Sequence, residues 1–388
     1  MYNKRNVTSA AFLAMLIFGI VMAVLGSVLP SVIEKFKITI INAGSLFVIM
    51  NLGMLLGSMI FGPIVDRYGY KGLLTICAII IFAGIEGIAL SPTMFLLKVS
   101  LFFVGFAGGA INGGANALVA DINEGNKSSG LSYLGVFFGI GAFSVPFILG
   151  SLLDHFKYET IIGAVGMLIL IPLLFFTFIS FPGAKHSQGV PLKESTGLLK
   201  ETLLLLLGMM LFIQSGLEMV ISGWSSTYFS ESFHTSPREA VLLLSVYWLA
   251  LMIARIILGK ILVNANHTRV LNMGLIIALA GTILMVLGPT KYVALSGLAL
   301  TGFGFAAVFP MVLGFVGDAY ARLSGTAFSL VLAMGLLGGM FLPWITGIMA
   351  EQFGLRYTLL LAPLCLLASL IIFNIIRKQK SLEKHIIQ

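Results

Sequence analysis

The sequence predicts an all-α membrane protein of twelve transmembrane helices, arranged as two pseudo-symmetric six-helix bundles. Of its 388 residues, 59% are hydrophobic and only 10% are charged, with a mean hydropathy of +1.06. A soluble chain carries roughly 25% charged residues, so lipid must surround much of this one. Inside a bilayer only helices and closed barrels satisfy the backbone. The apolar runs are continuous and about 20 residues long, which favours helices over alternating barrel strands.

The chain divides at one long polar connection, whereas the other predicted connections are short. This linker, 182–199, contains two prolines and three glycines. We expect an N-terminal six-helix bundle over 1–181 and a C-terminal bundle with a short cytoplasmic tail over 200–388. The predicted spans are 8–32, 42–65, 73–91, 95–121, 129–153, 159–181, 200–229, 238–263, 268–288, 291–318, 323–350 and 356–376.

Basic residues in the predicted loops indicate orientation. The side that holds both termini and the linker has 15 of the 23 Lys and Arg residues, the opposite side has 7, and Arg255 lies within a helix. Because positive residues accumulate on the inner side, we expect both termini in the cytoplasm of a multi-pass cell-membrane protein. We therefore attribute the net charge of +8 to basic loop residues that set the orientation in the membrane, and we expect no nucleic-acid partner.

The two halves repeat at a shift of 197 residues. Matched positions include acids and prolines, which are rare in such an apolar chain: Glu34 falls on Glu231, Asp121 on Asp318 and Pro146 on Pro343. Repeat halves of this kind place a solute near the bilayer midplane and rock about it.

The most specific motif lies between the second and third predicted helices, from Gly62 to Gly72. It resembles the major facilitator signature G-x-x-x-D-R-x-G-[RK]-[RK] at all but one position, where Tyr70 replaces a base. A glycine at 62 allows close helix approach, and one at 69 allows a tight turn. The likeness implies a major facilitator fold and assigns conformational gating to Gly62, Asp66, Arg67, Gly69 and Lys71.

A few ionisable residues lie inside predicted helices, where each costs several kcal/mol unless it is paired or hydrated. Glu218 has Gln214 one turn earlier on the same face, and a pair with Arg255 of the next helix is plausible. The competing interpretation is a purely structural polar pair. Glu86 lies near the outer end of the third predicted helix, and the favoured interpretation is that its side chain simply extends to the lipid headgroups.

Amides and aromatic rings supply further candidates for solute contact. Asn112 and Asn116 are four residues apart in the fourth predicted helix, so they share a face and suit a hydroxyl-rich ligand. Interhelical amide hydrogen bonding beside glycines is an equally good interpretation. Trp224 and Trp248 can stack on the C–H face of a sugar, and an interfacial aromatic belt is the alternative.

Further motifs resemble the fucose permease family, and more closely its sodium-dependent glucose transporter-like branch. They include Gly216-x-Glu218, Gly223-Trp224-x-x-Thr227-Tyr228 and Tyr247-Trp248. The resemblance implies hexose or deoxyhexose uptake driven by protons or sodium, with Asn116, Glu218, Trp224 and Arg255 in the cavity. The permeases have a carboxylate where Gly26 stands and a helix-4 acid where Asn112 stands, so Glu218 is the favoured coupling residue.

We therefore expect a monomeric symporter of a small sugar-like solute that works by rocker-switch alternating access. It should need no bound cofactor or metal and catalyse no covalent chemistry. The alternative is a drug or metabolite efflux antiporter of the same fold. Such exporters usually carry a Gly-Pro pair followed by a Gly-Gly pair in the fifth helix. The pairs Val145-Pro146 and Leu149-Gly150 match half of that pattern. A non-transporting sensor or scaffold is a weaker alternative, because it would normally add a long soluble domain.

Overall fold

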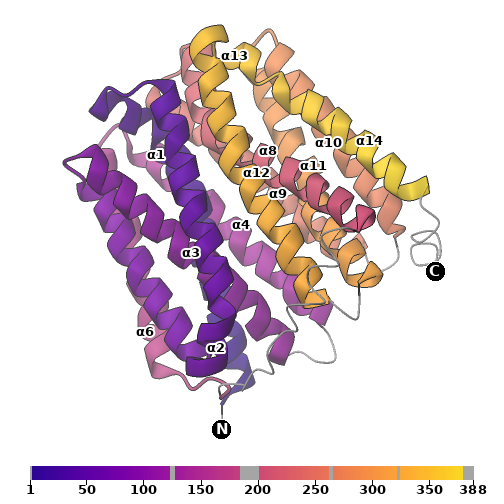
Figure 1. Cartoon of the computed structure of the whole chain (residues 1–388). Helices are drawn as coiled ribbons and strands as arrows, with labels where there is room; N and C mark the ends of the chain where they lie inside the picture. The colour runs from indigo at the N-terminus through magenta and orange to yellow at the C-terminus, as the bar shows by residue number, and fades with distance from the viewer. Residues whose placement is uncertain (1, 123–126, 184–200, 262–264, 321–323, 379–388) are drawn as a thin grey trace. The chain divides into compact units, whose positions relative to one another are not determined.

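The computed structural model describes residues 2–122, 127–183, 201–261, 265–320 and 324–378. Throughout these ranges the regular structure is α-helix, without a strand (Figure 1). The helices are α1 (Lys4–Phe36), α2 (Ile40–Leu90), α3 (Met94–Ile122), α4 (Lys127–Leu152), α5 (Tyr158–Leu168), α6 (Leu170–Phe178), α8 (Thr202–Phe233), α9 (Pro237–Ile261), α10 (His267–Leu287), α11 (Lys291–Ala319), α12 (Ser324–Phe353), α13 (Leu355–Thr358) and α14 (Leu361–Lys378).

Twelve helical spans within the described residues are long and apolar enough to cross a membrane, which confirms the predicted fold class. The long helix α2 contains two of these spans, Ile40–Phe61 and Tyr68–Leu90. Two pairs of consecutive helices make one span each: α5 with α6, and α13 with α14.

A single glycine interrupts the helical backbone of α2 near the start of its second span. Gly69 has φ 74° and ψ 173°, a backbone conformation that residues with a Cβ rarely adopt. The conformation agrees with the tight turn that the sequence motif predicts at this position. Without such a residue, the helical hydrogen bonding of α2 would continue from the first span into the second.

Side-chain caps define where several helices begin. Thr39, Asn266 and Thr290 each accept a hydrogen bond from the backbone N–H three residues later, at the starts of α2, α10 and α11. Each cap satisfies one of the donors that the first helical turn leaves without a partner.

The internal repeat reappears in the packing between helices. In the N-terminal half, Gly84 of α2 faces Val104 of α3 closely enough that an added Cβ would collide with it. In the C-terminal half, Gly281 of α10 faces Thr301 of α11 in the same way. Both residues of the second contact are displaced by 197 from those of the first, so the sequence repeat corresponds to a repeated helix–helix contact.

A second pair of glycines brings helix backbones together. Gly141 of α4 lies against the carbonyl oxygen of Leu16 in α1, and Gly338 of α12 lies against that of Phe212 in α8. A Cβ at either glycine would overlap the opposing carbonyl group. These contacts explain why small residues recur at matched positions, since in lipid helix association depends on close packing.

The chain forms two compact units, and two of the boundaries between them lie inside helices α8 and α9. One unit contains 1–188 and 223–248, and the other contains 189–222 and 249–388. The predicted halves, 1–181 and 200–388, stay a prediction about domain organisation. The segment 223–248, which comprises the last third of α8 and the first half of α9, groups here with the N-terminal helices.

Gly141→Ala should lower the thermal unfolding midpoint in detergent, because overpacking a close contact costs about 1–3 kcal/mol. The matched control is Gly314→Ala in α11, where nothing lies within 4 Å of the added Cβ. Alanine there should leave stability unchanged or raise it by up to about 1 kcal/mol. Equal midpoints for the two variants would argue against the close α1–α4 contact.

Candidate substrate and coupling site

A buried polar pair lies in the middle of α8. The Gln214 Nε2 donates a hydrogen bond to Glu218 Oε2 at 3.5 Å. Gln214 is 2% exposed and Glu218 is 8% exposed, so both side chains are inside the protein. They meet because residues four apart lie on one face of a helix. The Gln214 Oε1 is also buried and has no hydrogen-bond partner among the described residues, which leaves an acceptor for a ligand.

Arg255 of α9 acts on the same carboxylate. Its positive charge is close enough to act electrostatically on Glu218, and both residues belong to the same compact unit. A direct pair between the two side chains stays a prediction. The cluster of Gln214, Glu218 and Arg255 thus combines an anion, a cation and an amide within membrane-spanning helices. Such groups are costly in a bilayer unless they pair or serve a function.

The two asparagines of α3 meet as predicted. The Nδ2 of Asn116 donates to Asn112 Oδ1 at 3.0 Å and to the Asn112 carbonyl oxygen at 2.9 Å. Both residues are half-buried. Because these two bonds use the amide donors of Asn116 within its own helix, the groups still available for a ligand are the Asn112 amide N–H groups and the Asn116 oxygen.

The two candidate tryptophans are buried among aromatic rings of the N-terminal helices. The Trp224 ring lies 5.8 Å from that of Phe47 in α2, and the Trp248 ring lies 5.8 Å from that of Phe138 in α4. Both tryptophans are 0% exposed, so neither forms part of an exposed aromatic belt. The Nε1 of Trp248 is a buried donor without a hydrogen-bond partner among the described residues.

The predicted gating residues lie around the break in α2. Lys71 is exposed, and Gly69 forms the break itself. Gly62 lies within the first part of α2. The side chains of Asp66 and Arg67 are outside the part of the structure that is described, so their gating role stays a prediction.

Sequence reasoning missed the contact made by Tyr70, the residue that replaces a base in the motif. Its hydroxyl donates a hydrogen bond to Asp121 Oδ2 of α3 at 2.6 Å, and the Tyr70 side chain is buried. Asp121 was recognisable as one of the acids matched between the halves. The hydroxyl thus reaches a carboxylate from a position where the motif usually has a positive charge.

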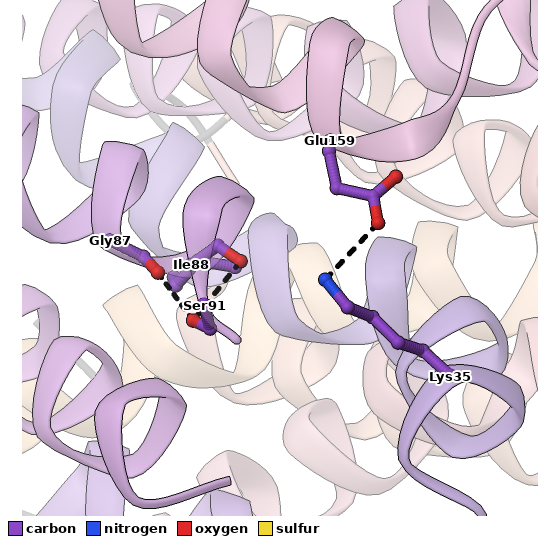
Figure 2. Close-up of polar contacts among 5 residues, drawn as sticks. All are labelled: Lys35, Gly87, Ile88, Ser91 and Glu159. Carbon is purple, nitrogen blue, oxygen red and sulfur yellow. Dashed lines mark hydrogen bonds and ion pairs between the residues drawn. The ribbon is translucent and has the colours of Figure 1, made fainter. Parts of the chain in front are cut away.

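An ion pair joins the end of α1 to the start of α5. Figure 2 shows Lys35 extending toward Glu159, with the Lys35 Nζ 3.1 Å from Glu159 Oε1. The Lys35 Nζ also lies 5.4 Å from the centre of the Tyr158 ring, within the range of a cation–π interaction. Figure 2 also shows Ser91, whose hydroxyl donates to backbone carbonyls at the end of α2.

The segment 223–248 is attached to the N-terminal helices by polar contacts as well. Arg238, at the start of α9, forms an ion pair with Asp154, which follows α4. Ser226 donates a hydrogen bond to the carbonyl oxygen of Gly26 at 2.8 Å. The ion pair is about half exposed, and pairs of this kind contribute little to stability individually, about 0–1 kcal/mol.

Twelve apolar spans with a few buried polar groups define a multi-pass membrane protein. The Major Facilitator Superfamily profile matches residues 11–331 and, in a second match, 207–387. The chain therefore belongs to the Major Facilitator Superfamily.

Relatives cover most of the chain at low identity. The uncharacterized transporter y4wD of Sinorhizobium fredii is 25% identical over 355 residues, which span 88% of this chain and 90% of that protein. A TsgA homolog of Buchnera aphidicola is 22% identical and spans 92% of both chains. The glucose/mannose transporter GlcP of Bacillus subtilis is 22% identical over 347 residues, which span 85% of this chain and 84% of GlcP.

Solved structures share the fold. The nucleoside transporter NupG aligns with a TM-score of 0.77 at 14% identity, covering 97% of this chain and 100% of NupG. A bacterial homolog of the human lysosomal transporter Spinster aligns with a TM-score of 0.75 at 15% identity, covering 96% of each chain. The family assignment and the relatives above identify the chain as a transporter of small solutes through the membrane, and not as an enzyme.

Tyr70→Phe should lower the free energy of unfolding by about 1–3 kcal/mol, because it removes a hydrogen bond to a charged group. Asp121→Asn should cost a similar amount. If the two residues act through their mutual bond, the double variant should lose less than the sum of the single losses. Additive losses in thermal unfolding would show that the bond contributes no coupling energy.

Proposed function

We propose that the chain takes up a small hydroxyl-rich solute, a hexose or deoxyhexose, across the cytoplasmic membrane. Uptake proceeds by alternating access and is coupled to a proton or sodium gradient. The single observation that carries this proposal is the cluster of the buried Gln214 and Glu218 in α8 with the half-buried Arg255 in α9. Such a cluster in a membrane transporter is a functional site by default, because burying charge without a function would be costly.

The chemistry of the cluster suits both a polar solute and a cation. The free Gln214 Oε1 can accept a hydrogen bond from a hydroxyl group. The Glu218 carboxylate can bind a proton or give oxygen ligands to sodium. A cation that binds Glu218 competes with Arg255 for the same negative charge. Cation binding would therefore release the guanidinium to donate hydrogen bonds to the solute, which links the two binding events.

The relatives support sugar as the solute class. GlcP is named a glucose/mannose transporter, and it aligns with most of this chain. Aromatic rings also stack on the C–H faces of sugars, and Trp224 and Trp248 remain the predicted stacking partners. Asn112 and Asn116 remain predicted hydrogen-bonding contacts through their amides. An efflux antiporter for drugs or metabolites is the competing proposal for the same fold, and transport assays separate the two.

Glu218→Gln should abolish accumulation of the solute while preserving exchange. The amide cannot carry the coupling cation, so the internal-to-external concentration ratio should fall to about one, the equilibrium value of an uncoupled carrier. The measurement is uptake of radiolabelled glucose, mannose and fucose into proteoliposomes, with proton and sodium gradients imposed separately. Counterflow in preloaded vesicles reports the exchange.

Glu231→Gln is the matched control, because Glu231 is an exposed carboxylate in the same helix. It should accumulate solute like the unaltered protein. Normal accumulation by Glu218→Gln would exclude the coupling role of Glu218. Absence of sugar uptake under both gradients, together with saturable dye efflux, would support the exporter.

The termini and the linker should face the cytoplasm. A single cysteine at Lys193 in the linker should resist a membrane-impermeant maleimide in intact cells and react after permeabilisation. A cysteine at Lys157, which precedes α5, should react in intact cells. Both variants should be made in a background with Cys77 and Cys365 replaced by serine. The reverse labelling pattern would invert the proposed orientation.

A further inference from the structure

Glu86 lies in the second span of α2, and its carboxyl group is directed at α5 instead of away from the protein. The two glycines that it meets, Gly163 and Gly166, lie on one face of α5. The Glu86 Oε1 is buried and has no hydrogen-bond partner among the described residues. The expectation that this side chain reaches the headgroups stays a prediction, and the structure adds that its carboxyl group lies against α5.

The glycines of α5 create the space that the carboxyl group occupies. A Cβ built on Gly166 would collide with Glu86 Oε1. A Cβ on Gly163 would stand 3.3 Å from Oε2, tighter than an ordinary contact. Any larger residue at Gly166 would force the carboxyl group to move. The niche is therefore specific to the combination of a glutamate on α2 and glycines on α5.

The niche lies at the edge of the protein that faces lipid. On α2, Ala83 and Leu90 flank Glu86 by one turn on either side, and both are exposed. On α5, Met167 follows Gly166 directly and is 55% exposed. Since these exposed side chains are apolar and lie in helices long enough to cross a membrane, the surface next to the carboxyl group is apolar.

No ion pair neutralises Glu86 among the described residues. The nearby cation of α1, Lys35, is already bound to Glu159 at 3.1 Å (Figure 2). Helix α6 carries no titratable residue. The other titratable groups near the ends of α3 and α5 include Lys98 of α3, Tyr158 of α5, and Asp154, His155 and Lys157 before α5. Asp154 is paired with Arg238.

We propose that the Glu86 carboxyl group binds a proton, as a second cation site in the compact unit that does not contain Glu218. A bare carboxylate beside hydrocarbon is too costly to persist without a partner. Sodium prefers several oxygen ligands, and the niche offers one carboxyl group between two glycines. The described residues also contain no group of three or more His, Cys, Asp or Glu side chains that could hold a metal ion.

The test is modification by dicyclohexylcarbodiimide, a hydrophobic reagent that reacts with protonated carboxyl groups. The acid O–H adds across one C=N bond, and rearrangement gives an N-acylurea that retains the whole mass of the reagent. The purified full-length protein in lipid nanodiscs should be modified at Glu86 at pH 7, as read peptide by peptide by mass spectrometry. The modification should decline as the pH is raised, and replacing potassium by sodium should not change it.

Glu159 is the internal control, because its carboxylate is paired with Lys35 and partly exposed. An ordinary glutamate is protonated in fewer than about 1% of molecules at pH 7, so Glu86 should be modified at least about tenfold more than Glu159. Glu86→Gln should abolish the modified peptide while the protein stays monodisperse with an unchanged helical circular dichroism spectrum.

Two outcomes overturn the proposal. Modification of Glu86 no greater than that of Glu159 would mean that no proton is held in the niche. Suppression of the Glu86 modification by sodium would assign the niche to a metal cation. The readout involves neither solute nor transport, so its failure would be distinct from a failure of the proposed uptake function.

Discussion

The satisfaction of backbone hydrogen bonds in lipid is the constraint on which this structure depends. Because hydrocarbon offers no partners to N–H and C=O groups, every membrane-crossing segment must be helical. The hydrophobic effect then does little to drive helices together. Van der Waals contact between helices that approach closely at small residues stabilises their association instead. Gly141 and Gly338 meet this need at equivalent places, and Gly69 provides the one conformation in which α2 can change from one span to the next.

The same constraint makes each intramembrane polar group informative. Gln214 and Glu218 pair along one face of α8, and Arg255 completes a balanced cluster. Asn112 and Asn116 satisfy part of each other's hydrogen-bonding capacity within α3. Glu86 differs from all of these, because the glycines of α5 leave space for its carboxyl group and no hydrogen-bond partner of its Oε1 is found among the described residues. Three ways of placing polarity in a membrane thus occur in one chain.

The features that the sequence predicted well are local or repeated ones. The spans follow from continuous hydropathy, the contacts Gln214–Glu218 and Asn112–Asn116 from helical spacing, and the turn at Gly69 from its motif. Contacts between distant segments were not predictable. Tyr70 and Asp121 are 51 positions apart, and their bond depends on how α2 and α3 pack. The direction of Glu86 likewise depends on glycines of α5, and spacing along α2 carries no information about them.

The balanced charges of the α8–α9 cluster have a consequence for energetics. Glu218 and Arg255 carry formal charges that sum to zero, so the cluster without a coupling ion is neutral. Under the proposed coupling, a bound proton or sodium ion would raise this sum to +1, and the membrane voltage would then act on the loaded carrier at about 2.3 kcal/mol per charge per 100 mV. A potential negative inside would thus drive the loaded form inward and leave the return of the empty form almost unaffected, making the transport cycle electrogenic.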